Sequence, residues 1–376
     1  MINPNNILMT KKICLTAIFR NESKNVKRCL DAAKPAFDCI SICDTGSTDN
    51  TVELIKQWGI DNNIPTKVHN ETFVNFGVSR TLSFTRARES FPDADYFLLL
   101  DADHILKFTD TWNRSELTAS SYMIKQVNPY IDYWNLRLIR ADKEWQSVGV
   151  THEYWTCSDF EPKQLNSIWI YDQEDGGHKA DKHTRDTKLL IDGINDDNTP
   201  EDVRVRYYFY LAQTYRDINQ RKESIYWYDK RVAAGGWNEE VYVAQCEKAN
   251  LLILEGADHT EIVSEHLKAF AIRPSRAEAL AQLAAYCRAS ERYAEGYIFS
   301  KIGKDIPLSN DILFVKRDIY EWKLLDDFAI CSYWIGQYEE SMTAGLKLLS
   351  LTMIPSSEVD RIKKNHNFTL QKLVDN

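Results

Sequence analysis

The sequence lacks three features that would each identify a class of protein. None of its 8 cysteines forms a Cys-x-x-Cys pair. No apolar run approaches the roughly 20 residues that a membrane-spanning helix needs. An excess of positive charge is also lacking, because 55 acidic residues outnumber 46 basic ones, and the net charge of −9 argues against a broad basic surface for a phosphate backbone. We therefore expect no nucleic-acid partner and no membrane span.

The cysteines indicate a reducing compartment. Several lie inside apolar runs, where a free thiol behaves as a small core residue. We interpret all of them as reduced thiols, which are typical of cytosolic proteins. The first ten residues are polar and do not resemble a signal peptide. The sequence therefore predicts a cytoplasmic protein.

The chain is long enough for two domains, and its composition changes near residue 190. Its 376 residues exceed the length of one typical domain. Residues 192–201 are rich in Asp and Asn and include Gly193 and Pro200, which is typical of a linker. We predict one domain over residues 1–190 and a second over residues 191–376.

The first domain alternates short apolar runs with helical segments. Strands are predicted at residues 13–19, 39–43, around 68 and at 96–100, and helices at 25–33, 51–58 and 76–90. Such alternation predicts a largely parallel sheet with helices on its faces. Irregular β structure is expected over 113–171 and a loop over 172–183. Ligands of parallel sheets bind beyond the carboxyl ends of the strands.

Nearly every segment beyond the linker is predicted to be helical. Small and aromatic residues recur there at the spacing of tetratricopeptide-type helix pairs: Ala212, Tyr215, Ser224 and Tyr228, then Ala329, Ser332 and Ser341. We predict an all-α, tetratricopeptide-like repeat domain. Its expected role is to bind a protein partner, to self-associate or to present an acceptor.

The strongest chemical signal is an apolar strand that ends in two aspartates, Asp101 and Asp103. Hard cations such as Mg²⁺ and Mn²⁺ prefer carboxylate oxygens and are often shared with substrate phosphates. An isolated Asp-x-Asp is more often a solvated turn. Here, however, two other strands also end in polar residues, at positions 20–22 and 44–51.

Together these motifs resemble glycosyltransferase family 2, whose catalytic domain has the GT-A fold, a Rossmann-like and mostly parallel mixed sheet. The matching stretches follow the family's order: residues 19–22, 44–51, 76–80 and 98–103. The resemblance covers about the first domain. It implies transfer of a sugar from a nucleoside-diphosphate sugar.

The resemblance assigns roles to residues in these stretches. The nucleoside would be contacted by Arg20, Asn21, Glu22 and Asp44. Arg80 would assist nucleotide binding, Asp101 would face the ribose and the metal, and Asp103 would be the main metal ligand. One position departs from the pattern, because Thr45 occupies a place where many members have a second acid. A UDP-linked donor is still the expectation.

Residues 149–153 resemble the Val-His-Glu stretch of a family-2 subgroup that decorates bacterial surface polysaccharides. This region carries the acidic general base in the wider family. An inverting transferase needs a carboxylate to take the proton of the acceptor, and we choose Glu153. The alternative is a surface Glu on a strand. His152 would orient the base or touch the metal, unless it is a buried structural histidine.

A polar, glycine-containing segment follows at residues 172–182. In many GT-A enzymes a late residue, often His, completes the metal site, and a nearby basic residue neutralises the leaving diphosphate. We assign these roles to His178 and Lys182. Asp172, Asp175 and His152 compete with His178 as the third ligand.

The sequence thus predicts an inverting glycosyltransferase that depends on Mn²⁺ or Mg²⁺ and acts on a hydroxyl group of a glycan or polypeptide. The first alternative is a non-catalytic scaffold in which a degenerate sugar-nucleotide domain is carried by a binding solenoid. The second is a nucleotidyltransferase, but residues 20–23 lack the glycines of the basic loop that such enzymes usually have.

Overall fold

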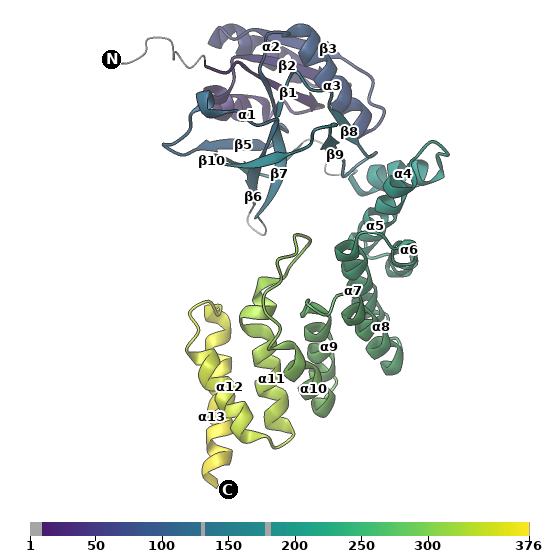
Figure 1. The fold of residues 1–376 in the computed structure, drawn as a ribbon, viewed down its shortest axis with the longest axis vertical. Coiled ribbons are helices and arrows are strands. Elements are labelled where there is room, and N and C mark those ends of the chain that lie inside the picture. The colour runs from purple at the N-terminus through teal and green to yellow at the C-terminus, as the bar shows by residue number, and fades with distance from the viewer. Residues whose placement is uncertain (1–9, 129–131, 177–181, 376) are drawn as a thin grey trace. The chain divides into compact units, whose positions relative to one another are not determined.

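The structure is a computed structural model that describes residues 10–128, 132–176 and 182–375 (Figure 1). These residues fall into two compact units, one within residues 1–195 and one within 196–376. The first unit is α/β and the second is built of helices. The predicted fold class, an α/β domain followed by an all-α domain, is confirmed.

The described part of the first unit contains an eight-stranded mixed sheet in the order β3-β2-β1-β4-β7-β6-β10-β5. Four neighbouring strands are parallel: β1 (Ile13–Phe19), β2 (Cys39–Asp44), β3 (Thr66–Asn70) and β4 (Tyr96–Leu99). The sheet is completed by β5 (His104–Phe108), β6 (Ser121–Val127), β7 (Asp132–Arg140) and β10 (Pro162–Asp172). β4 pairs antiparallel with β7, and β5 with β10. A separate antiparallel pair consists of β8 (Gln146–Val148) and β9 (Tyr154–Thr156).

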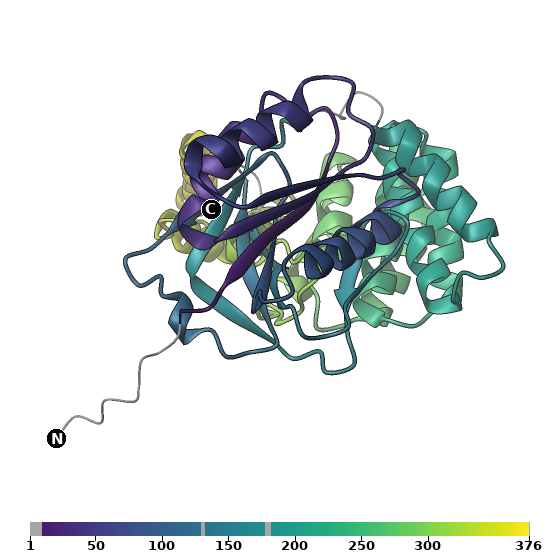
Figure 2. The ribbon, with the colours of Figure 1, turned by 90° about the horizontal axis from the view of Figure 1, so that it is seen from above.

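Both faces of β1, β2 and β4 are buried, which explains their nearly continuous apolar sequences, whereas the edge strand β3 is polar and partly exposed. Ile13 and Leu15 of β1 pack in a core with α1 (Val26–Ala33) and α2 (Thr51–Asn62). Cys14 points to the opposite face, as alternation along a strand requires, and joins the core of α3 (Phe76–Ser90). Figure 2 shows these helices on the two sides of the sheet.

The loop and linker predictions are wrong where α4 (Lys182–Asn195) forms. This helix takes in the end of the predicted loop, residues 172–183, and the start of the predicted linker, residues 192–201. Asp186, Leu190 and Gly193 are buried on one side of it. Their spacing follows the helical period, so the buried stripe outweighs the polar composition that suggested a linker.

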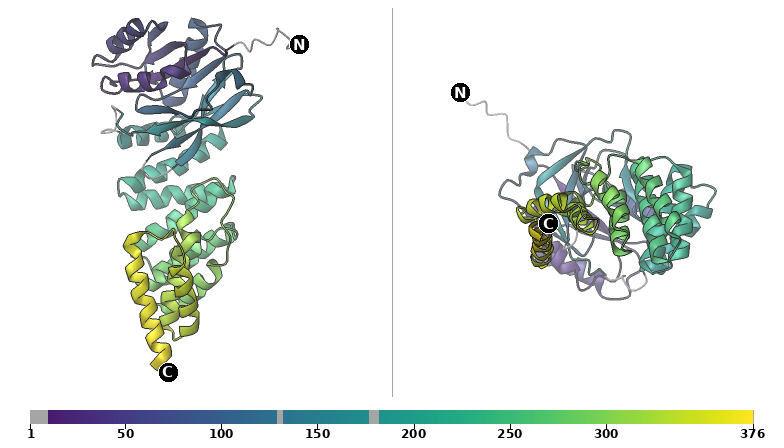
Figure 3. Two further views of the ribbon diagram at one scale, coloured as in Figure 1. Left: turned by 90° about the vertical axis from the view of Figure 1, so that its left-hand side faces the viewer. Right: turned by 90° about the horizontal axis from the view of Figure 1, so that it is seen from below.

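The second unit is a series of helices, each packed on the next (Figure 3). They are α5 (Glu201–Asp217), α6 (Arg221–Ala234), α7 (Asn238–Leu254), α8 (His259–Ile272), α9 (Glu278–Ala289), α10 (Tyr293–Gly303), α11 (Leu324–Trp334), α12 (Tyr338–Leu349) and α13 (Ser356–Asp375). No helix in the described ranges is both long and apolar enough to cross a membrane.

Two helix pairs of this unit each make the same kind of buried contact. Ser224 Oγ of α6 donates to Ala212 O of α5 at 2.7 Å, and Ser341 Oγ of α12 donates to Ala329 O of α11 at 2.9 Å. Small residues at these positions let the paired helices approach closely. The recurring small residues of the sequence therefore mark equivalent helix–helix contacts.

Candidate active site

The carboxyl ends of β1 and β4 open onto a cleft of about 460 Å³, within the roughly 300–1,000 Å³ typical of small-molecule sites. β1 lies between β2 and β4, so the chain order reverses there, and parallel sheets bind ligands at such points. The predicted site residues that line the cleft are Arg20, Glu22, Arg80, Asp101, Asp103, His152, Glu153 and Lys182.

Arg80 bridges two of the acidic motifs. Its Nη2 donates to Asp101 Oδ1 at 2.8 Å, and its Nε donates to Glu153 Oε1 at 2.5 Å. Burial alone would lower the pKa of Arg80, but the two carboxylates more than offset this and raise it above its ordinary value. The charged guanidinium therefore fixes Asp101 and Glu153 relative to each other.

Arg137, on β7, is a cleft residue that sequence reasoning missed. Its Nη1 donates to Asp101 Oδ2 at 3.2 Å, and its Nε donates to Gln126 Oε1 at 2.8 Å. Burial would raise the pKa of Asp101, but Arg80 and Arg137 outweigh it and hold that pKa well below its usual range. Each oxygen of Asp101 thus accepts a hydrogen bond from an arginine.

His104 supports the turn that carries both aspartates. Its Nδ1 accepts a hydrogen bond from Asp101 N at 3.0 Å, so the proton of the neutral ring lies on Nε2. That atom lies 3.3 Å from Gln126 Nε2 and 3.6 Å from Asp101 Oδ2. Burial and the charge of Arg137 lower the pKa of His104 to about 3. The ring is therefore neutral at pH 7, with both nitrogens already engaged.

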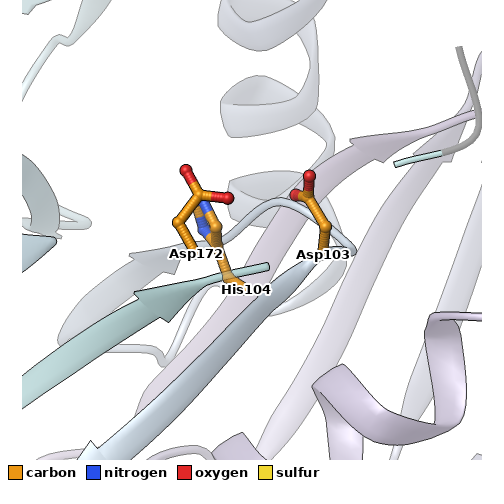
Figure 4. Close-up of side chains that lie close together, drawn as sticks. All are labelled: Asp103, His104 and Asp172. Carbon is orange, nitrogen blue, oxygen red and sulfur yellow. The ribbon is translucent and has the colours of Figure 1, made fainter. Parts of the chain in front are cut away.

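Asp103, His104 and Asp172 bring metal-ligand atoms within 4.8 Å of one another (Figure 4). The register of the sheet explains this, because Asp172 of β10 pairs directly with His104 of β5. Burial and the charges of Asp101 and Asp172 raise the pKa of Asp103 to about 6. Burial, together with the charges of Glu174 and Asp101, also raises the pKa of Asp172. Paired carboxylates of this kind favour a proton or a cation between them, so the set fits a divalent metal.

Asn21 and Asp44 are not among the residues that line the cleft. Asn21, with a φ of 55°, accepts a hydrogen bond from Thr48 N at 2.7 Å. Asp44 Oδ2 accepts from Gly46 N and Ser47 N at 3.1 and 3.0 Å. Asp44 Oδ1 is buried with no hydrogen-bond partner. A buried acceptor without a partner is costly, and Asp44 is one of the residues that line an adjacent hollow.

The first turn of α3 positions the segment that carries His152 and Glu153. Phe76 N donates to Val150 O, and Gly77 N donates to Gly149 O, both at 3.0 Å. The first N–H groups of a helix have no partner within it, so these carbonyl groups satisfy them. The start of α3 thereby places Glu153 beside Arg80, which lies one turn further along the helix.

We expect Gly77→Ala to destabilise this arrangement. A Cβ at Gly77 would lie 2.4 Å from Gly149 O and 2.9 Å from Ser147 O. The strands or the helix must shift, at a cost of about 1–3 kcal/mol. Thermal unfolding measures the loss, and Val78→Ala, at an exposed position of the same turn, is the matched control. Equal melting temperatures for the two variants would contradict the predicted clash.

The remaining predictions fall on the segment after β10. His178 lies outside the described residues. Lys182 is exposed at the start of α4 and lines the cleft. Asp175 accepts two hydrogen bonds from Arg28. Arg185, which was assigned no role from the sequence, lines the cleft and lies 4.9 Å from the ring centre of Phe76.

Residues 16–111 match the sequence model of the family described as Glycosyl transferase family 2. The first unit contains a family 2 glycosyltransferase domain. The resemblance inferred from the four motifs is therefore confirmed. The matched range of this glycosyltransferase domain includes Arg80, Asp101 and Asp103 and ends before Glu153.

The chain is also similar to solved structures at low identity. S. aureus TarS, residues 1–349, is 12% identical, with a TM-score of 0.38 over 74% of this chain and 92% of that one. A tetratricopeptide repeat protein from Parabacteroides merdae is 14% identical, with a TM-score of 0.38 over 51% and 70%. YrrB, described as a TPR protein with an unusual peptide-binding site, is 11% identical, with a TM-score of 0.35 over 51% and 84%. Among curated proteins, none matches this sequence.

Proposed function

We propose that the glycosyltransferase domain is inverting and metal-dependent, and that it moves a sugar from a nucleoside-diphosphate sugar to a hydroxyl group of a glycan or polypeptide. One observation carries the proposal. A pair of carboxylates suited to a cation, Asp103 and Asp172, lines the same cleft as the acid Glu153, and Arg80 and Asp101 join the two sides.

The donor would bind across the ends of β1, β2 and β4. Asp44 lines a hollow beside the cleft, and its carboxylate suits an N–H donor of the base, such as the N3–H of the uracil in a UDP-linked sugar. The exposed cations Arg20 and Lys182 line the cleft and would bind the diphosphate. The family assigns Asp101 to the ribose and the metal. Its hydrogen bonds with Arg80 and Arg137 favour a different role, which is to hold these two side chains in place in the cleft.

Asp103 and Asp172 would hold the divalent cation, Mn²⁺ or Mg²⁺. When bound, such an ion supplies a Lewis acid that stabilises the leaving diphosphate. His104 is a poorer ligand because Nδ1 accepts from Asp101 N and Nε2 faces Asp101 Oδ2. We therefore assign His104 to fixing the turn between Asp101 and Asp103.

Glu153 would act as the general base. The acceptor oxygen forms a bond to the anomeric carbon as the bond from that carbon to the diphosphate oxygen breaks, and the acceptor proton passes to Glu153. Oε1 of Glu153 is held by Arg80, so Oε2 would take the proton. His152 lines the cleft beside it and would help to orient the base or the acceptor.

Thermal-shift measurements with nucleoside-diphosphate sugars, with and without Mn²⁺, test the donor class. Ligand that binds only the folded state stabilises it by about 2.7 kcal/mol at 100 times its Kd. We expect the melting temperature to rise with concentration for one donor class and only when Mn²⁺ is present. The matching nucleoside monophosphate is the control because it lacks the diphosphate. Donor binding without any transfer or hydrolysis would instead support the non-catalytic scaffold.

The helical unit would bind a protein partner or a second copy, or present the acceptor. Its stacked helix pairs support this because such repeats form extended binding surfaces. All 8 cysteines of the sequence lie in described residues and are free. Free thiols support the cytoplasmic location expected from the sequence.

A further inference from the structure

Residues 172–176, a segment that begins at the last residue of β10, are held against α1 by one charged pair. Arg28 Nη1 and Nη2 donate to the two oxygens of Asp175 at 2.8 and 2.6 Å. Asn25 Nδ2, one turn earlier, donates to Asp175 O at 3.1 Å. A two-pronged pair between arginine and carboxylate fixes orientation as well as distance. Both the side chain and the backbone of Asp175 are therefore held against α1.

The same segment forms one wall of the proposed cation site. Asp172 is its first residue, and its Oδ1 accepts from Glu174 N at 2.9 Å. Gln173 N donates to Asp103 O at 3.3 Å. Gly176 lies so close that an added Cβ would be 3.1 Å from Asp103 Oδ2. The position of this segment, together with the pairing of Asp172 with His104, thus sets how closely Asp172 approaches Asp103.

We propose that Arg28 and Asp175 form a latch that positions the segment of residues 172–176 and thereby sets the affinity of Asp103 and Asp172 for a divalent cation. The inference rests on the proposed function, since it concerns the same cation. Two adjacent carboxylates repel each other, and the latch opposes their separation. Residues that orient metal ligands typically change metal affinity by about 10–100-fold when they are lost.

Because both side chains of the latch are partly exposed, its effect on cation affinity can be measured separately from any effect on folding. The side chains of Arg28 and Asp175 are 33% and 45% exposed. Ion pairs this exposed contribute little to stability. Removing Arg28 should therefore leave the fold intact, so that any loss of cation affinity reports on position and not on unfolding.

The test is a titration of the full chain with Mn²⁺, in which electron paramagnetic resonance measures free Mn²⁺. We expect Arg28→Ala to raise the Kd for Mn²⁺ about tenfold, and Arg28→Lys to raise it less because lysine makes one contact in place of two. In an Asp175→Ala background, Arg28→Ala should have no further effect. The exchange of both residues, Arg28→Asp with Asp175→Arg, should recover part of the affinity.

A matched control is available at the opposite ends of the strands. Arg114 pairs with Asp38 at 2.7 Å, with side chains 28% and 33% exposed, and Asp38 also accepts from Ile13 N at the start of β1. Arg114→Ala should leave the Kd for Mn²⁺ unchanged. If Arg28→Ala behaves like this control while Asp103→Asn abolishes binding, the latch is refuted and the cation site stands. If the wild type binds Mn²⁺ no more tightly than Asp103→Asn, the cation site and the latch are both refuted.

Discussion

Replacing Asp103 with Asn should abolish stabilisation by Mn²⁺ and lower donor turnover by at least about 100-fold. A Lewis acid contributes several kcal/mol to the stabilisation of a leaving group, and each 1.36 kcal/mol is about tenfold in rate. Asn keeps the size of the side chain but removes its charge. Mn²⁺ titration and hydrolysis of the donor identified by thermal shift measure the two losses.

The same substitution should raise the melting temperature of the metal-free protein. Burial, Asp101 and Asp172 raise the pKa of Asp103 to about 6, above its ordinary value of about 3.9. A carboxyl group with a raised folded-state pKa contributes stability below about pH 4, and that stability is lost as the pH rises to about 6. At pH 7.5 the ionised group therefore destabilises the protein, and Asn removes this cost. We expect an increase of about 2–4 °C that disappears near pH 4.

The two effects of Asp103→Asn separate a metal ligand from a structural acid. A structural acid would lower the melting temperature when it is replaced, whereas a ligand in a repulsive pair would raise it. Asp110→Asn, at an exposed turn, is the control and should change neither the melting temperature nor Mn²⁺ binding. A lower melting temperature with normal Mn²⁺ affinity would contradict the role assigned to Asp103.

The parts of the site that could be predicted from sequence are local. The apolar run of β4 ends in Asp101 and Asp103, and α3 carries Arg80 in a helix predicted at its observed bounds, Phe76–Ser90. In both cases the signal and the residue lie within one element. Hydrophobic period and strand-end position are properties that a single segment displays, so no knowledge of pairing was needed.

Strand pairing explains what the local signals left open, because Arg137 was missed and Asp172 was only one of several competing metal ligands. Arg137 reaches Asp101 because β7 runs antiparallel beside β4, with Leu138 opposite Leu98. Asp172 reaches the turn because it lies opposite His104. Nothing near either residue in the sequence indicates these neighbours. A single arginine between leucines on a strand also suggests a solvent-facing position, whereas Arg137 is buried against Gln126 and Asp101.

Glu153→Gln should lower donor turnover by about 100- to 10,000-fold, which is the range for loss of a general base. The amide cannot take a proton from the acceptor or from water. Its oxygen can still accept the hydrogen bond from Arg80 Nε, so Arg80 and Asp101 should keep their positions. We therefore expect the Kd values for Mn²⁺ and for the donor to stay within about twofold of the wild type.

The split between turnover and binding distinguishes a base from a structural acid. Arg80→Ala removes the partner of both Glu153 and Asp101, so it should weaken donor binding as well as turnover. Glu161→Gln, at an exposed position just before β10, is the matched control and should change neither. Full turnover in Glu153→Gln, alongside a loss in Arg80→Ala, would mean that Glu153 only anchors Arg80. In that case the proton acceptor would have to be another residue of the cleft.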